Sequence, residues 1–256
     1  MEAFTLRKNI LAKRKSDRQQ QNLGSSHSPL SGIKGDWQTD MENTTQRFER
    51  EYRQENLDLP TEIEAISIFD EWQMGSLQNR ISSKFWELKT PKKNQAWLDI
   101  GCGLSFLIYP WYEWGAFFYG QEVSAVARDI LMSRGPQLNS KLFRGVKLGA
   151  GHLLAYEDSQ FDGAIATGWS CYYPQSYWEK VIAEVKRVLK PGGSFIFDVI
   201  DPETPLAEDW AILETYLGTE VLLTPLSEWR SLVSQAGGKI VKSSSGELFQ
   251  CWQVTF

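Results

Sequence analysis

The chain has few of the residues that build metal centres and disulfide frameworks. Its 256 residues include two histidines and three cysteines, Cys102, Cys171 and Cys251. The cysteines are odd in number and far apart in sequence, which argues against a disulfide framework or a zinc cluster and favours a reducing compartment. The sequence also lacks any apolar stretch near the roughly 20 residues that span a bilayer. These absences predict a soluble, cytoplasmic protein with no metal site and no membrane insertion.

Acidic residues outnumber basic ones outside the first 35 residues. The net charge is −5, although residues 1–35 carry seven basic and only two acidic side chains. An acidic chain does not favour nucleic acid or an anionic membrane as its partner. Residues 1–40 are rich in Gln, Ser and charge and have few apolar anchors, so we predict a disordered basic tail. A nucleic-acid arm, a targeting peptide and a true start at Met41 remain open interpretations of this tail.

Two helices are expected between the tail and the main domain. Capping residues at Thr44 begin a segment with helical character that runs to Pro60. Apolar residues then recur at helical spacing over residues 64–88. We therefore interpret residues 41–94 as a helical N-terminal extension.

From Gln95 onward, strands and helices alternate. Short apolar runs typical of buried strands occupy residues 96–100, 116–123, 161–167 and 194–200. Helical patterns occupy residues 124–135, 176–190 and 225–238. The first of these is expected to end at Gly135-Pro136. The last residues, 239–256, are typical of two strands joined at a Ser-Gly turn. The alternation predicts an α/β domain over residues 95–256, with a doubly wound, mostly parallel sheet and a C-terminal antiparallel hairpin.

The segment WLDIGCG places an acid and two glycines at the end of the first predicted strand. Asp99 precedes Gly101 and Gly103, and Glu122 ends the next strand about twenty residues later. Ligands of doubly wound sheets bind beyond the carboxyl ends of the strands, where glycines let the backbone approach a ligand. A carboxylate at the second strand can bind both hydroxyls of a ribose. Together these residues predict a nucleoside site, although two glycines alone also fit a tight strand-to-helix turn.

Four segments in this order resemble the class I S-adenosylmethionine-dependent methyltransferase family. They are WLDIGCG, YGQEVS, LLAYEDSQFDGAIA and EVKRVLKPGGSFIFDV, within a likeness that covers residues 95–256. The resemblance implies a seven-stranded, Rossmann-like methyltransferase fold, an enzyme, and S-adenosylmethionine as its cofactor. It also implies that the N-terminal extension covers the active site, with Trp72, Phe85 and Trp86 in the cover. A helix that packs on the sheet without touching substrate is an equally good interpretation of that extension.

The resemblance further implies a set of cofactor-binding residues, which are Asp99, Gly101, Cys102, Gly103, Glu122, Val123, Gly151, His152 and Thr167. In this set the glycines lie against the methionine and ribose, Glu122 binds the ribose hydroxyls, and Asp99 organises the glycine loop. Val123 flanks the adenine, to which Gly151 and His152 offer backbone hydrogen bonds. Two residues depart from the family pattern: Ser105 stands at the third glycine position, and Ala150 stands where relatives often carry an adenine-binding acid.

Methyl transfer from a sulfonium needs mainly alignment and a dry pocket, because the cofactor brings the reactive group. An oxygen or carbon acceptor also needs removal of a proton, for which His152, Tyr172 and Tyr173 are candidates by position. The sequence lacks the Asn or Asp followed by Pro-Pro that marks many amide and nucleobase methyltransferases. The aromatic residues after the fourth strand suit either an apolar acceptor or the core.

We therefore predict transfer of a methyl group to oxygen, carbon or nitrogen of a small molecule, with nucleic acid an unfavoured partner. The sequence does not indicate the oligomeric state. A catalytically silent, cofactor-binding relative is the alternative, motivated by Ala150 and Ser105. A nicotinamide-dependent oxidoreductase comes third, since Ser105 replaces the glycine that a dinucleotide-binding turn usually needs.

Overall fold

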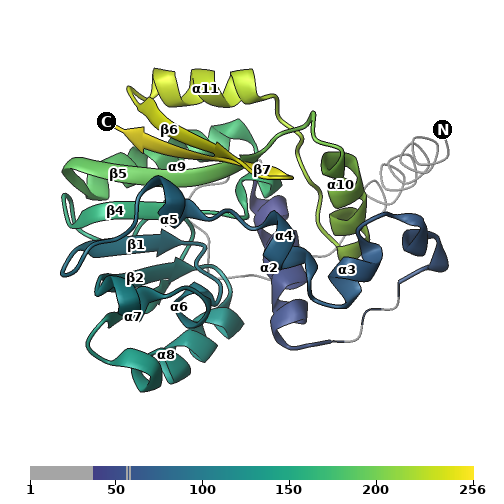
Figure 1. The fold of residues 1–256 in the computed structure, drawn as a ribbon, viewed down its shortest axis with the longest axis horizontal. Helices are drawn as coiled ribbons and strands as arrows, with labels where there is room; N and C mark the ends of the chain where they lie inside the picture. The colour runs from purple at the N-terminus through teal and green to yellow at the C-terminus, as the bar shows by residue number, and fades with distance from the viewer. Residues whose placement is uncertain (1–36, 56, 58) are drawn as a thin grey trace. The chain divides into compact units, whose positions relative to one another are not determined.

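Seven strands form one sheet in the order β3-β2-β1-β4-β5-β7-β6 in the computed structural model, which describes residues 37–55, 57 and 59–256 (Figure 1). The first five strands pair in parallel, and β7 pairs antiparallel with β5 and β6. Their bounds are β1 Ala96–Ile100, β2 Phe117–Glu122, β3 Phe143–Leu148, β4 Phe161–Ala166, β5 Leu189–Ile200, β6 Lys239–Ser245 and β7 Phe249–Thr255. The predicted fold class is confirmed, including the C-terminal antiparallel hairpin.

The helices that follow the strands are α6 Ser105–Ile108, α7 Trp111–Trp114, α8 Ala125–Asn139, α9 Gln175–Val188, α10 Leu206–Leu217 and α11 Leu226–Gln235. The expected end of α8 at Gly135-Pro136 is wrong, because the helix continues through Pro136. Gly135 does not cap the helix. A Cβ on this glycine would lie 2.7 Å from the ring of Phe143, so its small size allows α8 to approach β3 closely.

Helix α10 has no counterpart among the predicted elements. Most of its residues are buried, including Trp210, Leu213 and the carboxylate of Glu214. A helix that is covered on most of its surface lacks the polar face that produces a 3.6-residue hydrophobic period. The periodicity therefore gives no signal over residues 206–217.

The N-terminal elements also differ from the prediction. They are α2 Gln38–Tyr52, the 3-10 helix η1 Thr61–Ala65, and the short helices α3 Phe69–Gln73, α4 Leu77–Ile81 and α5 Phe85–Leu88. Helix α2 begins before Thr44 and ends before Pro60, and the predicted tail boundary at residue 40 lies inside it. The remainder of the predicted tail, residues 1–36, lies outside the described residues. The second predicted helix is divided, and Gly75, with φ +69°, separates α3 from α4.

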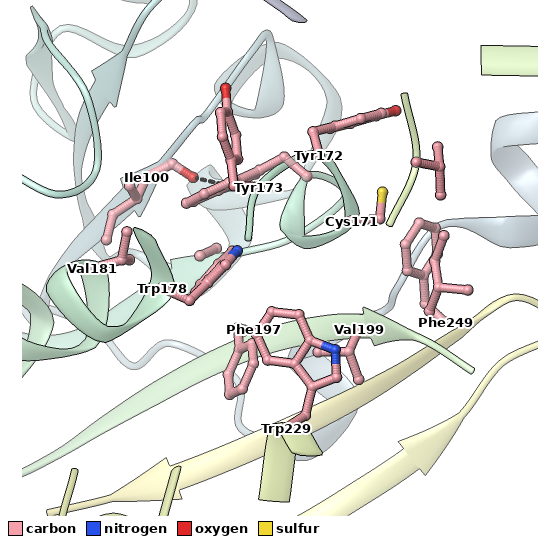
Figure 2. Close-up of a cluster of buried hydrophobic side chains, with 14 of the residues drawn as sticks. Ile100, Cys171, Tyr172, Tyr173, Trp178, Val181, Phe197, Val199, Trp229 and Phe249 are labelled. Carbon is pink, nitrogen blue, oxygen red and sulfur yellow. Dashed lines mark hydrogen bonds between the residues drawn. The ribbon is translucent and has the colours of Figure 1, made fainter. Parts of the chain in front are cut away.

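Aromatic side chains fill the core beside β5. Trp178 of α9 packs against both Phe197 of β5 and Trp229 of α11, with ring centroids 5.7 and 5.6 Å away (Figure 2). On β4, a Cβ at Gly163 would lie 2.6 Å from the ring of Trp97, so a glycine is needed for β1 and β4 to pack. None of the helices in the described residues is long and apolar enough to cross a membrane.

Candidate active site

A cavity of about 210 Å³ lies at the carboxyl ends of four neighbouring parallel strands. Ile100 ends β1, Glu122 ends β2, Thr167 follows β4, and Asp198 lies near the end of β5; all four line the cavity. The chain order reverses between β1 and β4, which is the position where doubly wound sheets bind ligands. Helices α2, α3, α4 and α10 gather beyond these strand ends (Figure 1). We call this space the strand-end cavity.

Two aromatic side chains cover the glycine turn after β1. Gly101 and Gly103 have φ values of +64° and +47°, which other residues rarely adopt. A Cβ at Gly101 would lie 2.7 Å from Nε1 of Trp169, and one at Gly103 would lie 2.7 Å from Oη of Tyr52. The Trp169 indole is fixed because its Nε1 donates to the Ile100 carbonyl at 2.8 Å. Neither position therefore has room for a side chain, so both must be glycine. A backbone without side chains can approach a ligand closely.

Glu122 joins the end of β2 to the glycine turn. Its Oε2 accepts a hydrogen bond from Gly103 N at 2.7 Å, and its Oε1 accepts one from Ser124 N at 2.9 Å. Burial raises the pKa of Glu122, and these backbone hydrogen bonds oppose that rise. A carboxylate has about four acceptor positions, so Glu122 keeps acceptor capacity on the wall of the strand-end cavity.

Asp99 lies behind the cavity wall. It is 3% exposed, and its Oδ2 accepts a hydrogen bond from the Ser105 hydroxyl at 2.5 Å. Burial raises the pKa of Asp99 to about 7; the Ser105 hydrogen bond lowers it and the charge of Glu122 raises it further. Ser105 departs from the glycine that the family pattern has at this position. Its hydroxyl donates to the buried Asp99, which a glycine could not do.

The structure brings some of the predicted cofactor residues to the cavity wall and leaves others away from it. Those on the wall are Gly101, Glu122, Val123, Gly151 and Thr167. Asp99, Cys102, Gly103 and His152 do not line it. The side chain of Cys102 is buried in the core, with Sγ 2.8 Å from where a Cβ of Gly120 would lie, so only its backbone is available to the turn and its cofactor role stays a prediction.

His152 packs among aromatic side chains beside the cavity. Its ring packs edge-on against Trp37 and Tyr177, with centroid distances of 5.9 and 5.2 Å. Burial lowers the pKa of His152, and the charge of Lys180 lowers it further against the opposing effect of Glu184. His152 does not line the cavity, and its catalytic role stays a prediction.

Tyr172 and Tyr173 do line the strand-end cavity, and Figure 2 shows both side chains pointing away from Phe197 and Trp229. Burial raises the pKa of each phenol well above its ordinary value. Both therefore stay protonated near neutral pH and are poor proton acceptors. Their geometry suits positioning of a ligand rather than removal of its proton.

Several residues of the site have no counterpart in the prediction. Arg47 of α2 donates through Nε and Nη2 to the two carboxylate oxygens of Glu214 on α10, at 2.8 and 2.7 Å. Gln121 is fully buried and holds the loop after β3, donating to the carbonyls of Ala150 and Leu153 at 2.7 and 2.9 Å. Gln121 and Asp198 are polar residues inside apolar runs of the sequence. This pattern is the signal from which buried polar residues of the site could have been predicted.

Known proteins resemble a segment of the chain that builds part of this cavity. Residues 98–197 match the family model described as a methyltransferase domain. The sterol 4-C-methyltransferase strm-1 of Caenorhabditis elegans is 32% identical over 104 residues, which are 40% of this chain and 30% of that protein. The 24-methylenesterol C-methyltransferase 2 of Arabidopsis thaliana is 29% identical over 134 residues, 50% of this chain and 36% of that protein. The chain thus spans about a third of the length of these curated relatives.

A solved structure shares the fold of most of the described residues. It is a SAM-dependent methyltransferase from Aquifex aeolicus, with a TM-score of 0.54 and 15% identity, covering 73% of this chain and 98% of that chain. At this identity the likeness supports the arrangement of the strands and helices.

Proposed function

We propose that this chain, whose residues 98–197 belong to the class I S-adenosylmethionine-dependent methyltransferase family, transfers a methyl group from S-adenosylmethionine to a small-molecule acceptor. The family match agrees with the resemblance found in the sequence, and S-adenosylmethionine is the cofactor of that family. The observation that carries the proposal is the hydrogen bond from Gly103 N to Glu122, which joins the turn after β1 to the acid at the end of β2 and supports their sharing one ligand.

The charge of the site supports a cationic ligand. Arg47 lines the cavity but is paired with Glu214. Glu122 and Asp198 also line it, Asp99 lies behind its wall, and all three carboxyl groups are at most 5% exposed. The hydrogen bonds described for them come from backbone N–H groups and a serine hydroxyl, not from a lysine or arginine in the described residues. Buried carboxylates without a cation are costly. S-adenosylmethionine carries an ammonium and a sulfonium, so its positive charge suits this cavity.

The residues of the chain have separable tasks in this proposal. The bound cofactor would supply an electrophilic methyl group. The glycine turn and Glu122 hold it, while Trp169 and Tyr52 exclude water from the turn. Tyr172 and Tyr173 position the acceptor. The chain supplies alignment and a dry cavity, which is what an in-line displacement needs.

The cavity wall favours an apolar acceptor. Aromatic rings of Tyr109, Trp169, Tyr172, Tyr173 and Phe249 line it. The two curated relatives named above are sterol C-methyltransferases, which supports a small apolar molecule as the acceptor class. The methylated atom is decided by product analysis after incubation with radiolabelled methyl donor and a panel of apolar alcohols, amines and alkenes.

Calorimetric titration with S-adenosylhomocysteine, with NAD as the control, tests the cofactor assignment. We expect S-adenosylhomocysteine alone to bind. Binding of NAD alone would favour the oxidoreductase, and binding of neither would restrict the proposal to the fold. Binding of S-adenosylhomocysteine without methylation of any acceptor in the panel would favour a catalytically silent relative.

Glu122→Gln is expected to weaken S-adenosylhomocysteine binding roughly tenfold, since a charge-assisted hydrogen bond contributes about 1.5 kcal/mol or more. Glutamine keeps one oxygen, so it preserves part of the bonding to Gly103 N and Ser124 N that alanine would remove. Glu113→Gln, at an exposed position on α7, is the matched control and should bind as the wild type does. Unchanged affinity in Glu122→Gln would remove this residue from the ribose site.

A further inference from the structure

Asp198 presents an unused carboxylate oxygen to the strand-end cavity. The residue lies near the end of β5, lines the cavity and is 1% exposed. Its Oδ1 accepts a hydrogen bond from Gly168 N at 2.8 Å. Its Oδ2 is buried, and no donor in the described residues lies within hydrogen-bond distance of it; the Ser83 hydroxyl is only close enough to lower the pKa of Asp198. A buried acceptor without a partner is costly, so a retained one points to a ligand group that completes it.

Two more buried polar atoms on the cavity wall share this condition. Ser83 and Trp210 both line the cavity, and neither Ser83 Oγ nor Trp210 Nε1 has a partner within hydrogen-bond distance in the described part of the chain. Weaker interactions do reach them, from Asp198 to Ser83 and from the Cys171 thiol to Trp210. Burial raises the pKa of Asp198 to about 7, and the nearby Ser83 hydroxyl opposes that rise. The wall thus offers a carboxylate oxygen, a hydroxyl and an indole N–H that can only donate.

This set of atoms selects among ligand groups. An ammonium donates only, so it would leave the Trp210 indole unpaired. A carboxylate or a ketone accepts only, and a carboxylate would also be repelled by Asp198. A hydroxyl both donates and accepts, so it can donate to Asp198 Oδ2 and accept from Ser83 or Trp210. The aromatic remainder of the wall, including Tyr109 and Phe249, suits an apolar body behind that hydroxyl.

We infer that Asp198, together with Ser83 and Trp210, binds a hydroxyl group on an otherwise apolar acceptor. This inference rests on the proposed function, because it names the acceptor class of the same cavity. Strand β5 is two strands from β1 in the sheet, which places Asp198 about 10 Å across the cavity from the β1 strand end that carries the glycine turn. A hydroxyl held at Asp198 therefore orients the acceptor opposite the cofactor turn.

Equilibrium dialysis with 2-naphthol and 2-methoxynaphthalene tests the inference. The two probes share a ring system, but only the naphthol can donate a hydrogen bond. In Asp198→Asn, Gly168 N keeps the amide oxygen as its acceptor, so an NH₂ group replaces Oδ2 and the acceptor at the cavity becomes a donor. We expect the preference for 2-naphthol over 2-methoxynaphthalene to fall about tenfold or more from the wild type to this variant. The extra methyl group of 2-methoxynaphthalene affects its binding to both proteins alike, so it does not alter the change in preference between wild type and variant.

Two further variants keep the test decisive. Asp162→Asn, at the opposite end of the parallel strands, is the matched control and should leave the preference unchanged. Trp210→Phe keeps an aromatic ring but removes the N–H, and should lower the preference by a smaller factor. An unchanged preference in both Asp198→Asn and Trp210→Phe overturns the inference; if Asp198→Asn does not fold, Trp210→Phe alone decides it.

S-adenosylhomocysteine binding of the same proteins separates this inference from the proposed function. Binding by the wild type with no change in probe preference among the variants would remove the hydroxyl site and leave the cofactor assignment intact. Loss of the probe preference in Asp198→Asn, in a protein whose wild type does not bind S-adenosylhomocysteine, would leave the hydroxyl site intact and remove the cofactor assignment.

Discussion

Replacing Glu214 by alanine is expected to lower the free energy of unfolding by about 3 to 5 kcal/mol, because the guanidinium of Arg47 then stays buried without its main partner. Glu214 is fully buried and bonds Arg47 through both carboxylate oxygens, at 2.7 and 2.8 Å. The pair joins α2 to α10, which lie far apart in the sequence. Chemical denaturation followed by circular dichroism measures the loss.

The cost comes from the charge that remains. Burial alone lowers the pKa of Arg47, but the charges of Glu214 and Glu51 raise it well above its ordinary value, so the side chain is charged. Arg47 is 5% exposed, whereas its other partner Glu51 is half-exposed. In the alanine variant a buried cation therefore depends on a carboxylate that water screens.

Two comparisons identify the cause of the loss. The double variant Arg47→Met with Glu214→Leu removes both charges and should regain most of the stability, since apolar replacement of a buried pair is often neutral. Arg53→Ala breaks an exposed pair with Glu49, 2.9 Å apart on the same helix, and should cost less than about 1 kcal/mol. A loss below 1 kcal/mol in Glu214→Ala would contradict the prediction, as would a double variant no more stable than the single one.

The same pair matters for the cavity. Thr44, Phe48 and Tyr52 of α2 line it, and Tyr52 covers Gly103. If α2 separates from α10 in Glu214→Ala, these side chains move away from the glycine turn. We therefore expect the single variant to bind S-adenosylhomocysteine more weakly than the charge-free double variant does.

The strands were predictable because their signals are local. The residues of β1, β2 and β4 form short apolar runs that the sequence displays directly, and the ends of β1 and β2 place Gly101 and Glu122 at one edge of the sheet. The failures have non-local causes. Pro136 remains inside a helix that packs on β3, and α10 is covered on most of its surface by other elements. Neither condition can be read from a window of neighbouring residues.

The site shows the same limit, because contacts between distant residues cannot be read from local sequence. The family resemblance identifies the glycine turn, whereas no local pattern indicates that Arg47 pairs with Glu214, 167 positions away. The cavity position of Asp198 depends on β5 lying next to β4, and Cys102 turns toward the core although both neighbouring residues belong to the turn. Spacing identifies which strand end carries a residue, whereas the direction of its side chain depends on packing.

Between pH 5 and pH 8, the free energy of unfolding of the wild type should fall by about 2 to 3 kcal/mol relative to that of Asp198→Asn. Burial raises the pKa of Asp198 to about 7 in the folded protein, whereas an unfolded aspartate has a pKa of about 3.9. The folded state therefore binds the proton more tightly. Its stabilising contribution is full below the unfolded pKa and is lost as the pH rises through 7, and asparagine has no such dependence.

Denaturation of both proteins at several pH values measures this difference, with Asp162→Asn as the control. Asp162 is a quarter exposed and paired with Lys190, so its removal should not produce the same slope. A wild type and an Asp198→Asn variant with parallel pH profiles would contradict the prediction. The expected slope has a functional meaning, because the carboxylate that lowers stability at neutral pH is buried only in the folded state. A protein that keeps Asp198 at neutral pH accepts lower stability in exchange for an oxygen that a ligand hydroxyl can use.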